Sequence, residues 1–308
     1  MANPYEKRTL KQDSILDKIE NQLTLARKLR KVYDKRPDPK SFVGAMAGTK
    51  FADQYTAEAI KKDENYVLET RKKIEEQNRS EGLSEFERKE GGFALGEMLQ
   101  SIVIDRLNNG WLGEFKAVMT SDFDDLKVGA DAVLKHNTGQ YLAASFDFTI
   151  ASQEKNIYNK LSNVWEKNVE SGSIPTIKYY EDPDTHEKRS IIAPKFIIGA
   201  SRQDVEDMAK CYIEGREDEL SDHKFQYMII EQMYEQLVSA RNYFDHHLDN
   251  EKLDFSRKHY RKIYDTVQRI RDKFQRENKI NNTDFYEYSK GSPALATMRN
   301  FKIAKENK

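Results

Sequence analysis

The segment from Tyr141 to Ile150, YLAASFDFTI, constrains the fold more than any other, because it places a carboxylate inside an apolar run. In a β-strand, alternate side chains point to opposite faces. One face then carries only apolar residues, namely Leu142, Ala144, Phe146, Phe148 and Ile150. The other face is small and polar, with Asp147 beside Thr149. A buried carboxylate is costly unless it is paired or binds a metal ion, so the sequence predicts a partner for Asp147.

A second acid occurs at the start of another apolar segment. Asp131 opens the predicted strand in GADAVLK (129–135), sixteen residues before Asp147. If the two strands are neighbours, the two carboxylates can meet at one point. Oxygen ligands of this kind suit a divalent cation, so the pair predicts a metal site.

Composition narrows the class of protein. The chain has 308 residues, of which 33% are charged, and its formal net charge is −1. We expect no membrane span and no membrane partner, because no run of 18 apolar residues occurs. The beginning of the chain, MANPYEKRTLKQD, lacks the apolar core of a signal peptide, which favours the cytoplasm. A single cysteine, Cys211, excludes an internal disulfide and a Cys-rich zinc site.

The near-zero net charge hides two basic segments. Residues 1–50 contain twelve Lys/Arg and six Asp/Glu, and residues 255–279 contain nine Lys/Arg and three Asp/Glu. Local positive charge attracts phosphate groups even in a neutral protein, so the segment 255–279 predicts either a phosphate-binding surface or the charged outer face of a helical hairpin.

Apolar spacing and turn residues predict the order of elements. Helices are expected at 8–33, 53–78, 93–110, 152–172 and 201–215, and strands at 114–120, 128–135, 141–150, 174–182 and 189–201. The segment SDFDD (121–125) is expected to be an acidic turn. This order predicts an α/β core with helices on both faces of the sheet.

Two long helices are expected after this core, at 222–248 and 252–279. Apolar residues in the second recur at coiled-coil-like spacing, at Ile263, Val267, Ile270 and Phe274. We therefore divide the chain into an N-terminal helical region (1–90), an α/β core (91–220), a C-terminal helical hairpin (221–285) and a basic flexible tail (286–308).

The order of a helix acid, a strand acid, a second strand acid and a helix resembles the core of PD-(D/E)XK nucleases, the restriction-endonuclease-like fold. Glu97 lies in the first helix, Gly-Ala-Asp (129–131) takes the place of the Pro-Asp motif, and Asp147-Phe148-Thr149 takes the place of (Asp/Glu)-X-Lys. The resemblance covers residues 93–200, about a third of the chain, and its motifs are short.

The resemblance implies a mixed sheet flanked by helices and a metal-dependent nuclease that hydrolyses DNA. It implies Mg²⁺ or Mn²⁺ bound by Glu97, Asp131 and Asp147, which would polarise a phosphoryl oxygen and activate water. The N-terminal helices and the basic hairpin would then position nucleic acid or mediate formation of a homodimer.

Thr149 departs from the family pattern, because threonine carries no cation where the family has lysine. Lys155 and Lys160, on the helix that follows, are the candidates to supply this cation, and Gln153 is a further polar candidate. If no lysine does so, the chain is a catalytically inactive relative that acts as a helical module binding nucleic acid or protein.

Other acidic and histidine residues have structural interpretations. Asp122, Asp124 and Asp125 are typical turn or cap residues, or additional metal ligands if they are functional. His246 and His247 are adjacent on a predicted helix, where their side chains diverge, which indicates an exposed helix end rather than a metal site.

Overall fold

The computed structural model describes residues 51–80, 92–113, 115–136, 144–150 and 154–306. The strands are β1 (Phe115–Met119), β2 (Ala132–His136), β3 (Ala144–Ile150), β4 (Thr176–Glu181), β5 (Lys188–Ile192) and β6 (Lys195–Ala200). The helices up to β6 are α2 (Ala57–Ser80), α4 (Gly92–Asn108), α5 (Asp122–Val128), α6 (Glu154–Val164) and the π-helix η2 (Trp165–Glu170). They are followed by α7 (Arg202–Ile213), α8 (Glu217–Ser221), α9 (Phe225–His246), the 3₁₀-helix η3 (Glu251–Leu253), α10 (Asp254–Arg276), α11 (Thr283–Lys290) and α12 (Pro293–Glu306).

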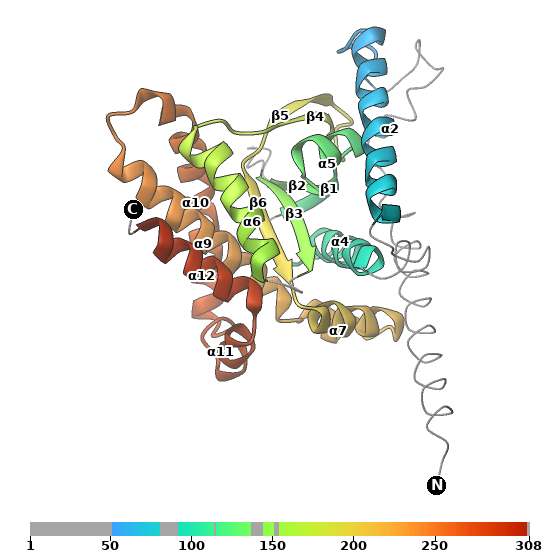
Figure 1. Ribbon diagram of the computed structural model, residues 1–308. Coiled ribbons are helices and arrows are strands. Elements are labelled where there is room, and N and C mark those ends of the chain that lie inside the picture. The colour runs from blue at the N-terminus through green and yellow to red at the C-terminus, as the bar shows by residue number, and fades with distance from the viewer. Residues whose placement is uncertain (1–50, 81–91, 114, 137–143, 151–153, 307–308) are drawn as a thin grey trace.

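The main sheet has four strands in the order β1-β2-β3-β6. β1, β2 and β3 are antiparallel neighbours, and β6 pairs with β3 in parallel after the chain has passed through α6 and the separate β4–β5 hairpin. A parallel pair needs such a crossover connection. The prediction of an α/β core is confirmed in this form, as a mixed sheet flanked by helices (Figure 1).

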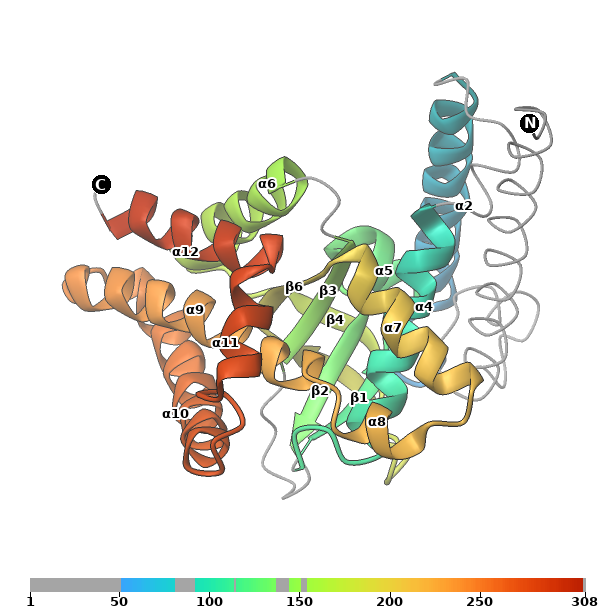
Figure 2. The same ribbon diagram turned by 90° about the horizontal axis from the view of Figure 1, so that it is seen from below.

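The two faces of the sheet are covered by different elements. On one face, Phe146 and Phe148 of β3 belong to the main apolar core, which includes the buried stripe of α4. On the opposite face, α6 packs against β6 and reaches β3 through the ion pair of Lys160 with Asp147. The β4–β5 hairpin packs over β1 and β2 through Val133, Ile177 and Tyr180. Figure 2 shows α4 and α6 on opposite sides of the strands. Asp147 therefore lies on the face shared by α6 and the hairpin.

Side-chain amides bind backbone groups on both edge strands of the main sheet. On β6, Gln232 and Gln236 of α9 each accept from the N–H and donate to the C=O of one residue, Gly199 and Ile197 respectively, at 2.7 to 3.0 Å. On β1, Asn108 at the end of α4 binds both backbone groups of Ala117 in the same way, at 2.9 and 3.0 Å. An amide side chain can do this because it carries one acceptor and one donor, as a peptide group does.

Gln232→Leu should destabilise the protein by about 2 to 4 kcal/mol, because it leaves the buried N–H and C=O of Gly199 without partners. Urea denaturation measures the change. Gln203→Leu on the exposed side of α7 is the matched control and should change stability by less than about 0.5 kcal/mol. Equal effects of the two substitutions would contradict this role of Gln232.

The predicted flexible tail at 286–308 is wrong, because its described part is helical and packed. α12 contacts α9 and α6, and its residues Ala294, Leu295, Met298 and Phe301 are buried. Gly199 lets this helix approach β6 closely, since a Cβ atom there would lie 2.6 Å from that of Ala294. The prediction relied on the frequent basic residues of the segment, which are typical of flexible tails, and overlooked the helical spacing of its apolar residues.

Two local predictions were also wrong. The acidic segment 121–125 begins the helix α5, because Ser121 caps it by accepting from the backbone N–H of Asp124. The single strand expected at 189–201 is two strands in different sheets, β5 and β6, separated at Pro194. Proline lacks the N–H that a continuous ladder requires.

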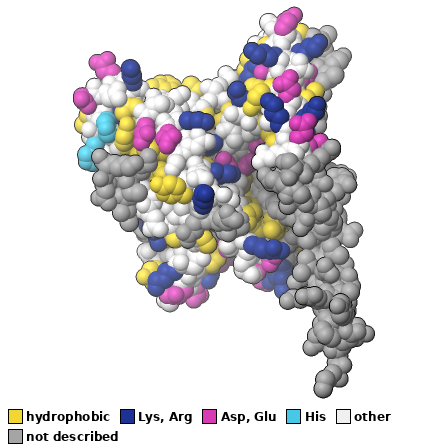
Figure 3. Space-filling model, in the orientation of Figure 1, with side chains coloured by type: hydrophobic (Ala, Val, Ile, Leu, Met, Phe, Trp, Pro, Cys, Tyr) yellow, Lys and Arg dark blue, Asp and Glu magenta, His cyan; other side chains and the backbone are white. Residues whose placement is uncertain are grey.

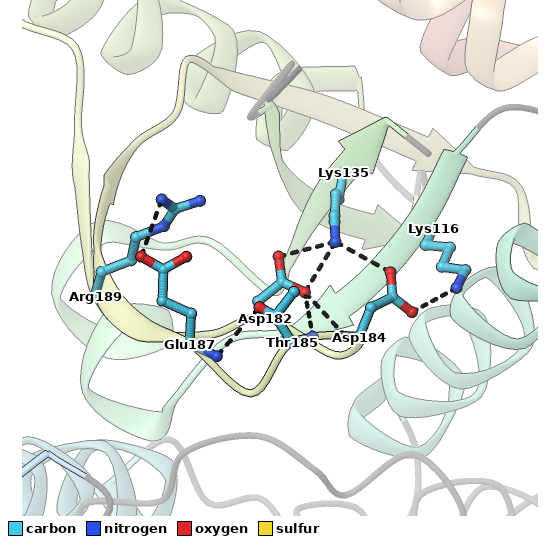
Figure 4. A network of polar contacts seen from close by, with 7 residues as sticks. All are labelled: Lys116, Lys135, Asp182, Asp184, Thr185, Glu187 and Arg189. Atoms are coloured by element: carbon cyan, nitrogen blue, oxygen red, sulfur yellow. Dashed lines mark hydrogen bonds and ion pairs between the residues drawn. The ribbon is translucent and has the colours of Figure 1, made fainter. Parts of the chain in front are cut away.

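A buried ionic network joins the β4–β5 hairpin to β1 and β2 (Figure 4). The ammonium group of Lys135 lies 2.8 Å from Asp182 and 3.1 Å from Asp184, and Lys116 binds Asp184 from the exposed side at 2.7 Å. Asp182 also accepts from the backbone N–H groups of Asp184 and Thr185 in the hairpin turn. Burial alone would raise the pKa of Asp182, but the hydrogen bonds from Lys135 and the turn hold it well below its ordinary value.

The C-terminal helices confirm the predicted pair. α9 and α10 pack along the seam of Ile263, Val267, Ile270 and Phe274, all of them buried, and Arg271 binds Glu231 across the interface at 2.5 Å. Among the described residues, no helix is long and apolar enough to cross a membrane. The predicted helix at 8–33 lies outside the described residues.

Candidate functional site

Asp131, which directly precedes β2, lies near Asp147 of β3. Ala132 pairs with Phe146 in the antiparallel ladder, and the N–H of Asp131 also donates to the C=O of Phe146, at 2.7 Å. The regular register therefore ends at Ala132, because a regular ladder would pair Asp131 with Asp147 and not with Phe146. The negative charge of Asp147 nevertheless acts on the carboxyl group of Asp131, so the two acids lie close in space.

The carboxyl group of Asp131 lies in an unfavourable electrostatic environment. Its Oδ2 atom accepts from the N–H of Phe148 at 2.6 Å. Burial, followed by the negative charges of Asp125 and Asp147, nevertheless raises the pKa of Asp131 well above its ordinary value. Repulsion among these carboxylates is what a bound cation or proton would relieve.

Two lysines approach Asp147, which is itself only 9% exposed. The ammonium group of Lys160, from α6, lies 2.5 Å from Oδ1 of Asp147, and that of Lys195, from the start of β6, lies 3.7 Å from Oδ2. Lys195 also donates to the C=O of Val128 at 2.8 Å, which holds its ammonium group in place. Burial lowers the pKa of Lys195 despite the nearby charge of Asp147.

Lys195 was missed by sequence reasoning. The only signal was a lysine directly after Pro194, at the beginning of an apolar run, where a charged residue is also typical of a strand end. Its position beside Asp147 depends on the parallel pairing of β3 with β6, in which Ser145 is opposite Lys195. Sequence spacing cannot supply that register.

Gly129 belongs to the same site. It ends α5 with a φ of +68°, in the left-handed region that glycine adopts without strain. A Cβ atom there would lie 3.1 Å from the ammonium nitrogen of Lys195 and 3.7 Å from Oδ2 of Asp147. Glycine therefore allows both the turn and the close packing of the lysine against the carboxylate.

The structure does not bring all the predicted site residues together. Among the described residues, no group of three or more His, Cys, Asp or Glu side chains could hold a metal ion, so Glu97 on α4 does not complete a set with Asp131 and Asp147. One helical turn later, Gln100 is the α4 residue that contacts Asp131, donating to its C=O at 3.2 Å. Thr149 is half-buried on β3, and Lys155 is exposed on α6. Gln153 lies outside the described residues.

The acids of the 121–125 segment have separate roles. Asp122 pairs with Arg71 of α2 at 2.5 Å. Asp124 accepts from the backbone N–H groups of Lys178 and Tyr179 in β4, at 2.7 and 3.0 Å, and thereby attaches α5 to the hairpin. Asp125 is the one whose charge acts on Asp131.

Two neighbouring carboxylates are groups that a hard divalent cation could use. Mg²⁺ is usually held by one or two carboxylates, with water and substrate phosphate completing its shell, so a third protein carboxylate is not required. Oxygen-only donors suit Mg²⁺ or Mn²⁺. Asp131 and Asp147 would hold the ion, whose charge would offset the negative charges of Asp125 and Asp147 that act on Asp131 in addition to its burial.

The sequence matches no protein-family model, no curated protein and no solved structure.

Proposed function

We propose that this chain is a metal-dependent nuclease that hydrolyses phosphodiester bonds of DNA, with Asp131 and Asp147 as the ligands of Mg²⁺ or Mn²⁺. The observation that carries the proposal is the pair of neighbouring carboxylates, in which the charge of Asp147 acts on Asp131, with the ammonium group of Lys160 2.5 Å from Asp147. Two acids and a lysine at one point are the groups that phosphoryl transfer needs for metal binding and charge stabilisation.

The order of elements supports the same proposal. α4, the antiparallel strands β1, β2 and β3, then α6 and the parallel strand β6 follow the arrangement expected of a restriction-endonuclease-like core. The acids also lie near the expected positions, Asp131 directly before β2 and Asp147 within β3. Lys160 of α6 would supply the cation that Thr149 lacks.

Each residue has a distinct task in this mechanism. Asp131 and Asp147 would hold a divalent cation, which would supply Lewis-acid catalysis of attack on phosphorus. Lys160, whose side chain is 39% exposed, would stabilise the negative charge that develops on the phosphate. Lys195, fixed by the C=O of Val128, would hold the Asp147 carboxylate in position.

Cleavage assays test the proposal directly. The full chain, incubated with supercoiled plasmid and with single-stranded DNA, should cleave at least one of them in Mg²⁺ or Mn²⁺ and neither in EDTA. Either ion should also raise the melting temperature, because a ligand that binds only the folded state stabilises it. Absence of both cleavage and thermal stabilisation would reject the proposal.

One observation favours a second candidate, a non-cleaving helical module for binding nucleic acid or protein. The charge of Asp147 is already balanced inside the chain by Lys160 and Lys195, so the site can be stable without a cation. This candidate predicts that the melting temperature does not respond to Mg²⁺ or Mn²⁺. The nuclease predicts an increase that saturates with ion concentration.

A further inference from the structure

The outer face of α10 carries an excess of positive charge. Its exposed cations are Lys258, Arg261, Lys262, Arg269, Lys273 and Arg276, hereafter the basic face. Only two exposed acids, Asp254 and Asp265, lie on the same helix. The chain as a whole has a net charge of −1, so this excess is a local property of the helix.

The cations of the basic face are largely free of acidic partners. Within the described part of the chain, no ion pair or hydrogen bond engages the side chains of Lys258, Arg261, Lys262, Lys273 or Arg276. The ion pairs of α10 use other residues, Arg257 with Asp254 and Arg271 with Glu231. The positive charge of these five side chains is therefore available to an external anion.

The cations also form a line along the helix. Lys258, Lys262, Arg269, Lys273 and Arg276 follow one another at steps of 4, 7, 4 and 3 residues, which keeps them on one side of an α-helix. At 1.5 Å per residue, the line is about 27 Å long. A linear array of this length matches a polyanion with regularly spaced charges better than a single small anion.

Another charged helix of the same protein shows that this pattern is not general. On α2, the exposed cations Lys61, Lys62, Lys72 and Lys73 alternate with the exposed acids Glu58, Glu69, Glu75 and Glu76. Lys and Arg side chains are accordingly interspersed with Asp and Glu on α2, at the upper right of Figure 3. α2 thus has a balanced surface, and α10 does not.

The apolar side of α10 indicates that the ligand of the basic face is nucleic acid and not a lipid surface. Helices that bind in the plane of a membrane insert their apolar face among the lipids. Here that face, with Tyr260, Ile263, Val267 and Phe274, is buried against the rest of the protein. Outside this buried face, α10 exposes one large apolar side chain, that of Phe255 at 50%, which is too little for insertion among lipids. Neutralisation of phosphates by Lys and Arg is the main source of affinity for DNA.

From these observations we infer that the basic face of α10 binds the phosphate backbone of nucleic acid, without regard to base sequence. The choice of DNA as the ligand rests on the proposed nuclease function and names the surface by which the substrate would be held. The binding itself requires no cleavage, so the two ideas can fail separately.

Fluorescence anisotropy with a labelled DNA duplex of about 20 base pairs, longer than the basic face, tests the inference in EDTA, where no cleavage occurs. The triple variant Lys258→Glu, Lys262→Glu and Lys273→Glu should bind at least about tenfold more weakly at ~0.1 M salt. The slope of log affinity against log salt should become shallower by about 3, one for each phosphate that a lysine no longer neutralises.

The matched control reverses the same number of charges on α2, as Lys61→Glu, Lys62→Glu and Lys73→Glu. It should bind within about twofold of the unmodified chain, because the contact is local rather than an effect of net charge. All variants should have unchanged circular dichroism and melting temperature, since the substituted residues are exposed. Equal reductions of affinity in the two triple variants, or no DNA binding by the unmodified chain, would overturn the inference.

Two further measurements separate the alternatives. Anionic phospholipid vesicles should not compete with the duplex, and competition by vesicles at equal phosphate concentration would replace nucleic acid by a membrane as the ligand. DNA binding through α10 without any cleavage in Mg²⁺ or Mn²⁺ would leave this inference standing and reject the nuclease. If the α10 triple variant cleaves DNA as fast as the unmodified chain, the nuclease proposal stands and the inference that α10 holds the DNA is rejected.

Discussion

Asp147→Asn should reduce metal-dependent cleavage of DNA by more than about 100-fold. Loss of an outer-shell partner of a metal costs up to about 100-fold, and loss of a direct ligand should cost more. Asparagine has the same shape as aspartate but carries no negative charge, so it removes both the expected metal ligand and the ion pairs with Lys160 and Lys195. The increase in melting temperature caused by Mg²⁺ or Mn²⁺ should disappear as well, because the affinity for the ion is lost.

The control for this experiment is Asp218→Asn, an exposed acid of α8. It should retain full cleavage activity and the full thermal response to the metal. Activity of Asp147→Asn equal to that of the unmodified chain would mean that the observed cleavage arises elsewhere or from a contaminant. In that case the neighbouring carboxylates of Asp131 and Asp147 would be structural, and the interpretation as a binding module would be preferred.

Lys135→Met should lower the free energy of unfolding by about 3 kcal/mol, the low end of the cost of removing one partner from a buried ion pair. Asp182 is fully buried, and without Lys135 it loses the cation that balances its charge, while the hydrogen bonds from the hairpin turn remain. Lys116→Met is the matched control, because Lys116 binds Asp184 on the exposed side of the same network. Its effect should not exceed about 1 kcal/mol. Urea denaturation of both variants gives the comparison.

The pH dependence of this effect has a definite sign. The network holds the pKa of Asp182 below its ordinary value, so the stabilisation is present above about pH 4 and is lost as the pH falls toward the lowered pKa. The difference in stability between the unmodified chain and Lys135→Met should therefore be greatest near neutral pH and become smaller below about pH 4. A difference that is independent of pH would show that Lys135 acts by packing alone.

The sequence predicts best those features that depend on local spacing. The alternating pattern of 141–150 places Phe146 and Phe148 on the core face and Asp147 on the other, as the structure has them. The apolar spacing of α10 likewise identifies its buried seam. These features need only the periods of a strand or a helix.

Features that depend on distant contacts could not be predicted. Lys195 reaches Asp147 only because β6 pairs with β3, which places Lys195 opposite Ser145, 50 residues earlier in the chain. Gln232 and Gln236 look like ordinary helix residues until α9 is placed beside β6. The prediction of a flexible tail at 286–308 failed for the same reason. Its apolar residues become buried only because α6 and α9 lie beside α12.

The amides on the margins of the main sheet limit how this protein can associate. An unprotected outer strand offers its backbone to any extended peptide, including another copy, and so invites fibril-like stacking. Asn108 occupies Ala117 on one margin, and Gln232 and Gln236 occupy Gly199 and Ile197 on the other. Strand addition at those positions would first have to displace a side chain that already satisfies the same groups, so association of copies through these strands is disfavoured.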